Sequence, residues 1–366
     1  MALQVSLSKR VFEFSFNART SRGAMKDKVS WFVNLWDDSN PEIVGLGECG
    51  PLPGLSPEFN AEFEASLHHT MDSINKQAVP FPAASDLQSI HLLIQKLIGP
   101  DTAQNNSSLV FALETALLDC LHGGERVLFR NSFVEGTPIP INGLIWMGGL
   151  DFMLQQIEIK IRDGFTCLKL KVGSHDFEKE CDVLQYIRRK YFRDKITIRL
   201  DANGAFKKEE ALFKINQLTR FEVHSIEQPI KPGLPELSQL CIQSPIPIAL
   251  DEELIGVTGI EKKRALLTRI KPQYIILKPT LHGGLFSCSE WIQLGQELGI
   301  GWWMTSALES NIGLNAIAQF TANYPIAIPQ GLGTGMIYNE NIESPLTINN
   351  GKLKYQKDLF WAKINE

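Results

Sequence analysis

The sequence lacks the features that mark membrane, secreted and zinc-binding proteins. No apolar run approaches the roughly 18 residues of a membrane-spanning helix. The N-terminus alternates polar and apolar residues, whereas a signal peptide has a basic segment followed by an apolar one. The six cysteines are scattered and form no CxxC pair, so neither a disulfide framework nor a zinc site is indicated. We therefore expect a reduced, cytoplasmic protein.

An excess of positive charge is also missing. Lysine and arginine total 36 against 41 aspartate and glutamate, a formal net charge of −5. Nucleic acids and anionic membranes are bound by basic surfaces, so neither is an expected partner. The composition, 44% hydrophobic and 21% charged, is that of an ordinary globular protein. The length of 366 residues allows two or three domains, or one large barrel with an appendage, which suits an enzyme with a small-molecule substrate.

The first 130 residues indicate an α+β unit. Apolar alternation predicts three antiparallel strands at 11–16, 31–36 and 42–47. Helical patterns follow at 57–76, 85–98 and 108–121. Two stretches interrupt these elements and are predicted as lid loops: the polar residues 17–30 and the proline- and glycine-rich residues 50–58.

Residues 138–335 predict a different architecture. Eight short β-rich runs alternate with helical stretches, and this number of βα units is the one expected for a barrel of parallel strands. An open doubly wound sheet is the alternative, but no GxGxxG motif follows the first strand. We expect the tail, residues 336–366, to pack back on the N-terminal unit. The expected inter-strand helices are 152–163, 177–190, 208–219, 234–244, 259–271, 285–298 and 313–322.

Charged residues occur where buried strands should be apolar. In the run 168–172, alternation sends the leucines and the valine to one face and both Lys169 and Lys171 to the other, toward the barrel interior. In the next strand the inward positions are Thr197, Arg199 and Asp201. Further charged residues end the following three strands, at intervals of 24–27 residues that correspond to about one βα unit: Glu227, Asp251 and Lys278. Active sites of such barrels lie at this end.

Three carboxylates that converge repel one another unless a cation lies among them. An all-oxygen set from Asp201, Glu227 and Asp251 fits a hard ion such as Mg²⁺. Nearby lysines could serve as bases that remove a proton α to a carboxylate. Taken singly, a Lys-x-Lys pair is usually a solvated strand edge, and a strand-end aspartate is often a helix cap. The common register of five charged positions favours the catalytic interpretation.

These residues resemble the enolase superfamily, muconate-lactonizing subgroup. The matching motifs are Lys169-x-Lys171, Asp201-Ala-Asn203, Glu227-Gln-Pro, Asp251-Glu and Lys278-Pro. Within the subgroup, four further segments are similar to the o-succinylbenzoate synthase family: 20–23, 45–58, 141–148 and 305–310. The resemblance implies an α/β fold, a modified TIM barrel (β/α)7β with an α+β capping domain formed by the N-terminal region and the C-terminal tail.

The resemblance also implies an activity. The expected reaction is a Mg²⁺-dependent syn dehydration of 2-succinyl-6-hydroxy-2,4-cyclohexadiene-1-carboxylate, a step of menaquinone biosynthesis, with Mn²⁺ able to replace Mg²⁺. Lys171 would be the base, Lys278 would stabilise the enediolate, and Lys169 would help to keep Lys171 neutral. Asp201, Glu227 and Asp251 would be the metal ligands. The expected substrate contacts are Arg199, Asn203, Ser306, Ser21, Arg22 and Gly331.

Two alternatives remain at this point. An N-succinylamino acid racemase would use the same scaffold, with Lys171 and Lys278 as bases on opposite faces of the substrate. A dipeptide epimerase is disfavoured, because no Asp-x-Asp follows the last strand. A non-catalytic metal-binding barrel is the second alternative, although an inactive descendant would usually have lost a ligand or a lysine.

Overall fold

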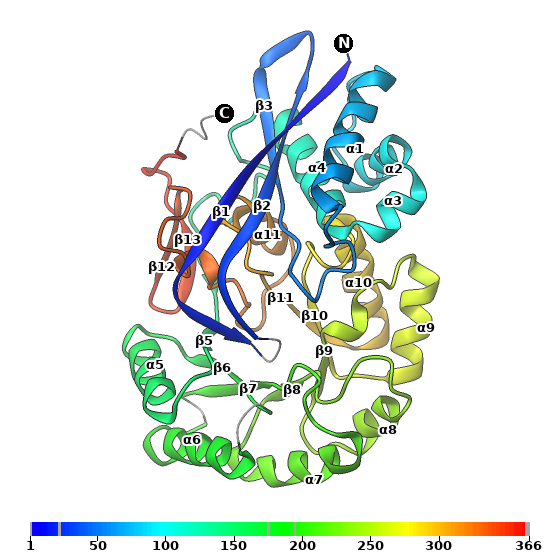
Figure 1. Ribbon diagram of the computed structural model, residues 1–366. Helices are drawn as coiled ribbons and strands as arrows, with labels where there is room; N and C mark the ends of the chain where they lie inside the picture. Colours follow the sequence, from blue (N-terminus) through cyan, green and yellow to red (C-terminus); the bar gives the residue numbers. More distant parts are fainter. Residues whose placement is uncertain (1, 21–22, 174–175, 194, 363–366) are drawn as a thin grey trace.

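A computed structural model describes residues 2–20, 23–173, 176–193 and 195–362. A barrel of parallel strands surrounded by helices forms its lower part, and an antiparallel sheet with four helices lies above it (Figure 1). Within these ranges no helix combines the length and apolarity that crossing a membrane requires.

The N-terminal unit is a three-stranded antiparallel sheet in the order β1 (Leu3–Thr20), β2 (Gly23–Asp37) and β3 (Asn40–Cys49). Helix α4 (Ser107–Leu121) packs against β3 and is buried over almost its whole length. It ends before Gly123 and Gly124, whose positive φ angles of 103° and 72° stop the helix. The other helices of this unit are α1 (Phe63–Gln77), α2 (Leu87–Ile98) and α3 (Pro100–Asn105).

The close approach of β3 to α4 depends on glycine. A Cβ atom on Gly47 would lie 1.8 Å from the carbonyl oxygen of Ala112. We expect Gly47→Ala to destabilise the protein by about 3 kcal/mol, because the backbone of strand and helix must separate. Gly149→Ala is the matched control, since Gly149 has an ordinary φ of −60° and open space around it. Urea unfolding measures both variants, and equal midpoints would contradict the packing argument.

The barrel is a seven-stranded parallel sheet in the order β11-β10-β9-β8-β7-β6-β5. Residues 330–331 take the place of an eighth strand, because isolated parallel bridges join Gln330 to Ile141 and Gly331 to Thr305. The strands are β5 (Gly143–Ile145), β6 (Cys167–Lys171), β7 (Thr197–Asp201), β8 (Ser225–Glu227), β9 (Ile248–Leu250), β10 (Tyr274–Leu277) and β11 (Gly301–Met304).

One helix follows each of these seven strands, as (β/α)7β architecture requires. The helices are α5 (Leu150–Arg162), α6 (Phe177–Lys190), α7 (Lys208–Leu218), α8 (Glu236–Gln243), α9 (Ile260–Ile270), α10 (Gly284–Leu298) and α11 (Asn311–Thr321). All seven overlap the helices expected from the sequence, and the fold class is confirmed.

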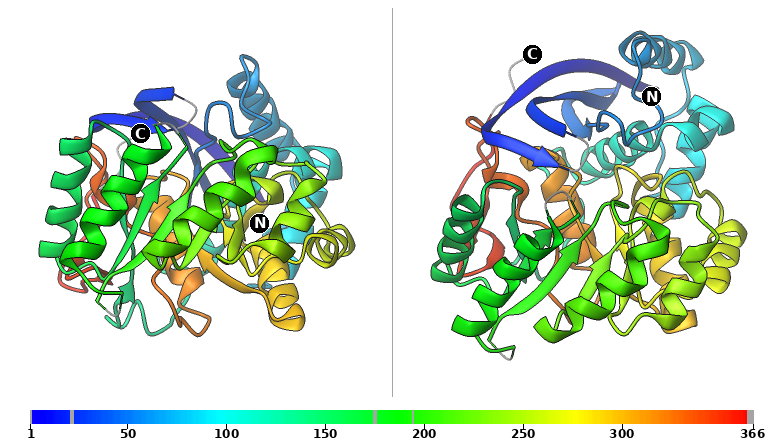
Figure 2. Two further views of the ribbon diagram at one scale, coloured as in Figure 1. Left: turned by 90° about the horizontal axis from the view of Figure 1, so that it is seen from below. Right: turned by 60° about the horizontal axis from the view of Figure 1, so that its bottom comes forward.

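The prediction that residues 17–30 form a loop is wrong for the described residues 17–20 and 23–30, which belong to strands, while their role as a lid stays a prediction. β1 continues to Thr20 and β2 begins at Gly23, so this stretch is the end of a long hairpin, with a register shift between Glu13 and Ala18. Backbone pairing does not require apolar side chains, so the polar sequence gave no alternation to detect. The hairpin arches over one end of the barrel (Figure 2).

The C-terminal tail contacts both parts of the molecule. The backbone of residues 337–339 hydrogen-bonds with β1, through Ser15 N–H to Ile337 O (2.8 Å) and Asn339 N–H to Glu13 O (2.9 Å). The strands β12 (Leu346–Asn349) and β13 (Lys352–Tyr355) instead form a small sheet with β4 (Ile139–Pro140) at the entry to the barrel. Trp361 and Ala362, at the far end of the described tail, pack against a hydrophobic cluster that includes Phe12, Phe14 and Phe32 of the N-terminal unit.

Candidate active site

The charged residues at the strand ends form one row in the sheet. Lys171 of β6 is in register with Asp201 of β7, and Asp201 is in register with Glu227 of β8. Asp251 follows β9 directly, and Lys278 follows β10. Parallel strands in register bring their carboxyl ends to one edge, so the side chains meet at the upper mouth of the barrel.

The three lysines pair with the three carboxylates. Lys169 Nζ lies 2.9 Å from Asp201 Oδ2 and 2.5 Å from Glu227 Oε2. Lys171 Nζ lies 2.6 Å from the same oxygen of Asp201, and Lys278 Nζ lies 2.5 Å from Asp251 Oδ2. Every one of these carboxylates is buried. Three positive and three negative groups give this set no formal net charge.

In this set of residues, burial and the neighbouring carboxylates shift the pKa values of the lysines in opposite directions. Burial lowers the pKa of Lys169, but the carboxylates of Asp201, Glu227 and Asp251 outweigh it and hold that pKa above its usual value. Burial likewise lowers the pKa of Lys278, and Asp251 and Glu227 reverse the effect. For Glu227, burial and the nearby Asp201 charge together raise the pKa well above its ordinary value.

The donor set fits a hard divalent ion. Glu227 Oε1 and Asp251 Oδ1 are buried and have no hydrogen-bond partner. Buried carboxylate oxygens rarely remain unpaired, and a cation is the partner that both lack. In the described part of the chain, however, no three acidic, histidine or cysteine side chains already converge in metal-binding geometry. The Lys169 ammonium lies between Asp201 and Glu227, so these carboxylates would have to turn toward an ion to bind it.

A cavity of about 530 Å³ opens above this row. All three lysines line its floor, and Leu52 and Leu55 of the 50–58 loop line its wall. The end of the hairpin contributes Phe16, Gly23 and Met25 to the lining. A cavity of this size suits a small organic substrate that is largely enclosed.

The structure places some of the expected substrate contacts in the cavity wall and others elsewhere. Asn203, Ser306 and Gly331 line the cavity. Arg199 does not: it lies two residues below Asp201 in the barrel interior, 1% exposed, with its guanidinium 4.1 Å from the Trp303 ring centre. Alternation explains this position, since Arg199 and Asp201 share the inner face but lie at different depths. Ser21 and Arg22 fall outside the described residues.

Among the cavity residues that were not expected as substrate contacts from the sequence, Asn142 and Thr305 have unpaired polar atoms. Asn142 Oδ1 and Thr305 Oγ1 are buried without a hydrogen-bond partner. Both flank the Gly331 segment, because Asn142 N–H donates to Gln330 O (2.9 Å) and Thr305 bridges Gly331. A Cβ atom on Gly331 would lie 2.4 Å from Thr305 Oγ1, so glycine is required at this close contact. The signal available in the sequence was a polar residue directly before the first barrel strand and another directly after the seventh.

His282 supports Lys278 from the following turn. Its Nδ1 accepts a hydrogen bond from the Lys278 backbone N–H at 3.1 Å. Burial lowers the pKa of His282 to about 3, so its imidazole is neutral and can act as this acceptor. The residue therefore holds the lysine backbone and does not provide a titrating group.

Comparisons with known proteins agree with this geometry. Residues 153–358 match the family described as "Enolase C-terminal domain-like". An o-succinylbenzoate synthase of Desulfotalea psychrophila is 42% identical over 96% of this chain and 98% of its own length. The crystal structure of MenC from Desulfotalea psychrophila superposes with a TM-score of 0.86 at 40% identity, covering 97% of this chain and all of that chain.

More distant relatives share the fold. A substrate-liganded complex of the L-Ala-D/L-Glu epimerase from Bacillus subtilis has a TM-score of 0.82 at 19% identity, covering 99% of this chain and 97% of that chain. At that identity the likeness concerns the architecture alone. The family match and the 42% identical relative together place the sequence, and the chain belongs to the enolase superfamily.

Proposed function

We propose that this chain is an o-succinylbenzoate synthase, a hydro-lyase of menaquinone biosynthesis. The observation that carries the proposal is the 42% identity to the Desulfotalea psychrophila enzyme over almost the whole of both chains. The convergence of three lysines and three carboxylates at the floor of a cavity of about 530 Å³ supports it. The reaction removes a proton from the ring carbon that bears the carboxylate and a hydroxide from the neighbouring carbon, which yields water and an aromatic ring.

In this proposal Lys171 is the base. Its Nζ is held by Asp201 (2.6 Å) and by Asn203 Oδ1 (2.8 Å), so the amine points to a fixed place on the cavity floor. Asn203 is itself held by two hydrogen bonds, from its N–H to Asp201 Oδ1 and from its side-chain Nδ2 to Glu252 Oε1, both 3.0 Å. After accepting the ring proton, Lys171 is an ammonium that can return a proton to the departing hydroxyl on the same face, which gives syn elimination.

Lys278 acts from the other end of the row. It is anchored to Asp251 and stays cationic, so its charge stabilises the electron-rich ring while the proton is absent. Lys169 contacts the same Asp201 oxygen as Lys171, and its positive charge there would help to keep Lys171 neutral.

Members of the enolase superfamily depend on divalent metal ions. We assign Asp201, Glu227 and Asp251 as the ligands of Mg²⁺, with Mn²⁺ as a substitute. A bound ion would supply positive charge against the substrate carboxylate and its enediolate form, and would offset the attraction of the three carboxylates for the lysines. With Lys171 neutral as the base, two lysine ammonium groups face three carboxylates, a formal charge of −1. A bound divalent ion would bring this to +1, which favours an anionic substrate.

The succinyl arm requires polar contacts away from the metal. We propose that the succinyl arm binds at the part of the cavity wall formed by Asn142, Thr305 and Gly331. Asn142 Oδ1 and Thr305 Oγ1 have no hydrogen-bond partner in the protein. The hairpin end and the 50–58 loop cover the ring with apolar side chains. The two lid residues Ser21 and Arg22 remain proposed contacts.

Racemisation of N-succinylamino acids is a second candidate, favoured by the presence of Lys171 and Lys278 at opposite ends of the carboxylate row. A racemase needs both lysines as bases, whereas the dehydration needs one. We expect the synthase reaction to dominate, so that in D₂O with Mg²⁺ the protein forms o-succinylbenzoate far faster than it exchanges the α-proton of N-succinylphenylglycine. Mass spectrometry of both products checks this, and comparable rates on the two substrates would overturn the assignment of a dedicated synthase.

A further inference from the structure

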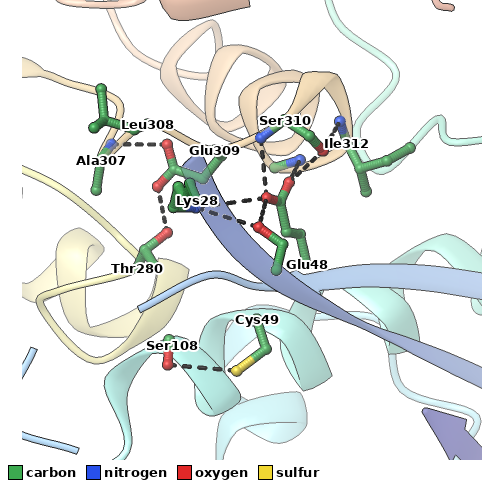
Figure 3. A network of polar contacts seen from close by, with 12 residues as sticks. Lys28, Glu48, Cys49, Ser108, Thr280, Ala307, Leu308, Glu309, Ser310 and Ile312 are labelled. Carbon is green, nitrogen blue, oxygen red and sulfur yellow. Dashed lines mark hydrogen bonds and ion pairs between the residues drawn. The ribbon is translucent and has the colours of Figure 1, made fainter. Parts of the chain in front are cut away.

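A buried carboxylate joins two loops of the site. Glu309 lies between β11 and α11, its side chain is 0% exposed, and it forms no ion pair with another described residue. It accepts three hydrogen bonds, from the Thr280 hydroxyl, from the Ser306 hydroxyl (2.5 Å) and from the Ala307 N–H (2.7 Å). Figure 3 shows this carboxylate between Thr280 on one side and the Ala307 backbone on the other.

The hydrogen bond from Thr280 connects Glu309 to the turn that follows Lys278. Thr280 is buried and lies two residues after the lysine, inside a closed turn. The Lys278 carbonyl accepts from the N–H groups of Leu281 (2.8 Å) and His282 (2.9 Å), and its own N–H donates to His282 Nδ1. A displacement of Thr280 is therefore transmitted to the lysine through a rigid turn.

The Ser306 contact fixes the cavity wall. A serine hydroxyl has one donor and two acceptor positions. That of Ser306 donates to Glu309 and accepts from the Thr334 hydroxyl (2.7 Å) and the Leu308 N–H (3.1 Å). All three positions are used within the protein, so Ser306 lines the cavity without a hydrogen bond to spare for substrate. Leu308, also in the wall, has a positive φ of 64°, a conformation that these contacts must hold.

We propose that Glu309 is a positioning residue for the dehydration, and that Ser306 serves it and does not bind substrate. The carboxylate sets the distance between Lys278 and the 306–308 wall by holding the loops after β10 and β11 together. This inference rests on the proposed function for its kinetic consequence, but its structural content can be tested separately.

A second carboxylate holds the same segment from the capping side. Glu48 of β3 accepts from the Ser310 N–H (2.9 Å) and hydroxyl (2.6 Å) and from the Gly313 N–H (3.0 Å), at the start of α11 (Figure 3). Because Glu48 anchors α11 independently, loss of the Thr280 contact should shift the site without unfolding the loop. Thr280 is accordingly a better test position than Glu309, whose removal would leave three buried donors unpaired.

The experiment compares Thr280→Val with Thr280→Ser. Valine keeps the volume and loses the hydroxyl, and serine keeps the hydroxyl. We expect Thr280→Val to lower kcat about tenfold with little change in KM, and to lower the melting temperature because the buried Glu309 Oε1 loses its hydrogen bond. Thr280→Ser should keep both properties close to those of the parent, with kcat within about twofold. Retained kcat in Thr280→Val, or an equal loss in Thr280→Ser, would overturn the proposal.

A double-mutant cycle and a crystal structure complete the test. If both contacts act through Glu309, Thr280→Val combined with Ser306→Ala should lower kcat no further than the more damaging single variant, and additive losses would contradict this. In crystals of Thr280→Val we expect Lys278 displaced relative to residues 306–308. An unmoved Lys278 in these crystals would refute the inference, whatever the activity of the parent protein. Failure of the parent protein to turn over the diene would instead refute the proposed function.

Discussion

Lys171→Ala is expected to lower turnover of the cyclohexadiene carboxylate by about 10³- to 10⁴-fold. The amine is the group that takes the ring proton in our proposal. Its neighbours Asp201 and Asn203 accept hydrogen bonds from it and hold it in place. The other amine on the same Asp201 oxygen, Lys169, is held by Glu227 at 2.5 Å and is not expected to replace it. Steady-state kinetics on the diene measures the loss.

Two controls separate loss of the base from loss of the site. Lys208→Ala removes an exposed lysine that pairs with Glu236 on the helical surface, and it should leave kcat unchanged. In Lys171→Ala itself, Mg²⁺ binding measured by calorimetry should persist, because the three carboxylates remain. Turnover in Lys171→Ala within about tenfold of the parent would exclude Lys171 as the base.

Glu227→Gln is expected to weaken Mg²⁺ binding by about 100-fold and to lower turnover by about 10³-fold. The amide keeps the shape of the side chain but removes a charge that the ion requires. In the metal-free protein the buried Glu227 carboxylate is costly, as its raised pKa shows, and its Oε1 has no partner. The substitution should therefore not lower the melting temperature in EDTA.

The distinguishing result is the response of the melting temperature to Mg²⁺. An ion that binds only the folded state raises the melting temperature of the parent protein. That rise should be lost in Glu227→Gln and kept in Glu290→Gln, a partly buried glutamate that pairs with Lys263 away from the site. If the parent protein shows no shift and no calorimetric binding of Mg²⁺ or Mn²⁺, the metal assignment fails and a non-catalytic barrel becomes the better interpretation.

The sequence predicted those parts of the molecule that depend on periodicity. Alternation in 168–172 placed Lys169 and Lys171 on the inner face, and the interval of one βα unit placed Asp201, Glu227 and Asp251 at neighbouring strand ends. Register in a parallel sheet then leaves no freedom in where these side chains meet.

Features that depend on tertiary contacts were not predictable. Alternation predicts that Arg199 lies on the inner face of its strand, but it does not predict how deep in the barrel the side chain lies. Its position below the cavity is therefore known only from the structure. The polar stretch 17–30 carries no sign that its backbone pairs as a hairpin. Ser306 and Glu309 allowed turn chemistry and a place at the mouth equally well. Only the contacts of the serine hydroxyl with Glu309, Thr334 and the Leu308 N–H show that it is fully used.

The most direct test follows the diene absorbance of 2-succinyl-6-hydroxy-2,4-cyclohexadiene-1-carboxylate on addition of the purified protein, with Mg²⁺ and with EDTA. We expect rapid loss of the diene and formation of o-succinylbenzoate with Mg²⁺, and no loss above the uncatalysed rate with EDTA. An unchanged diene in the presence of Mg²⁺ that is demonstrably bound would contradict the synthase assignment, while the superfamily membership would stand.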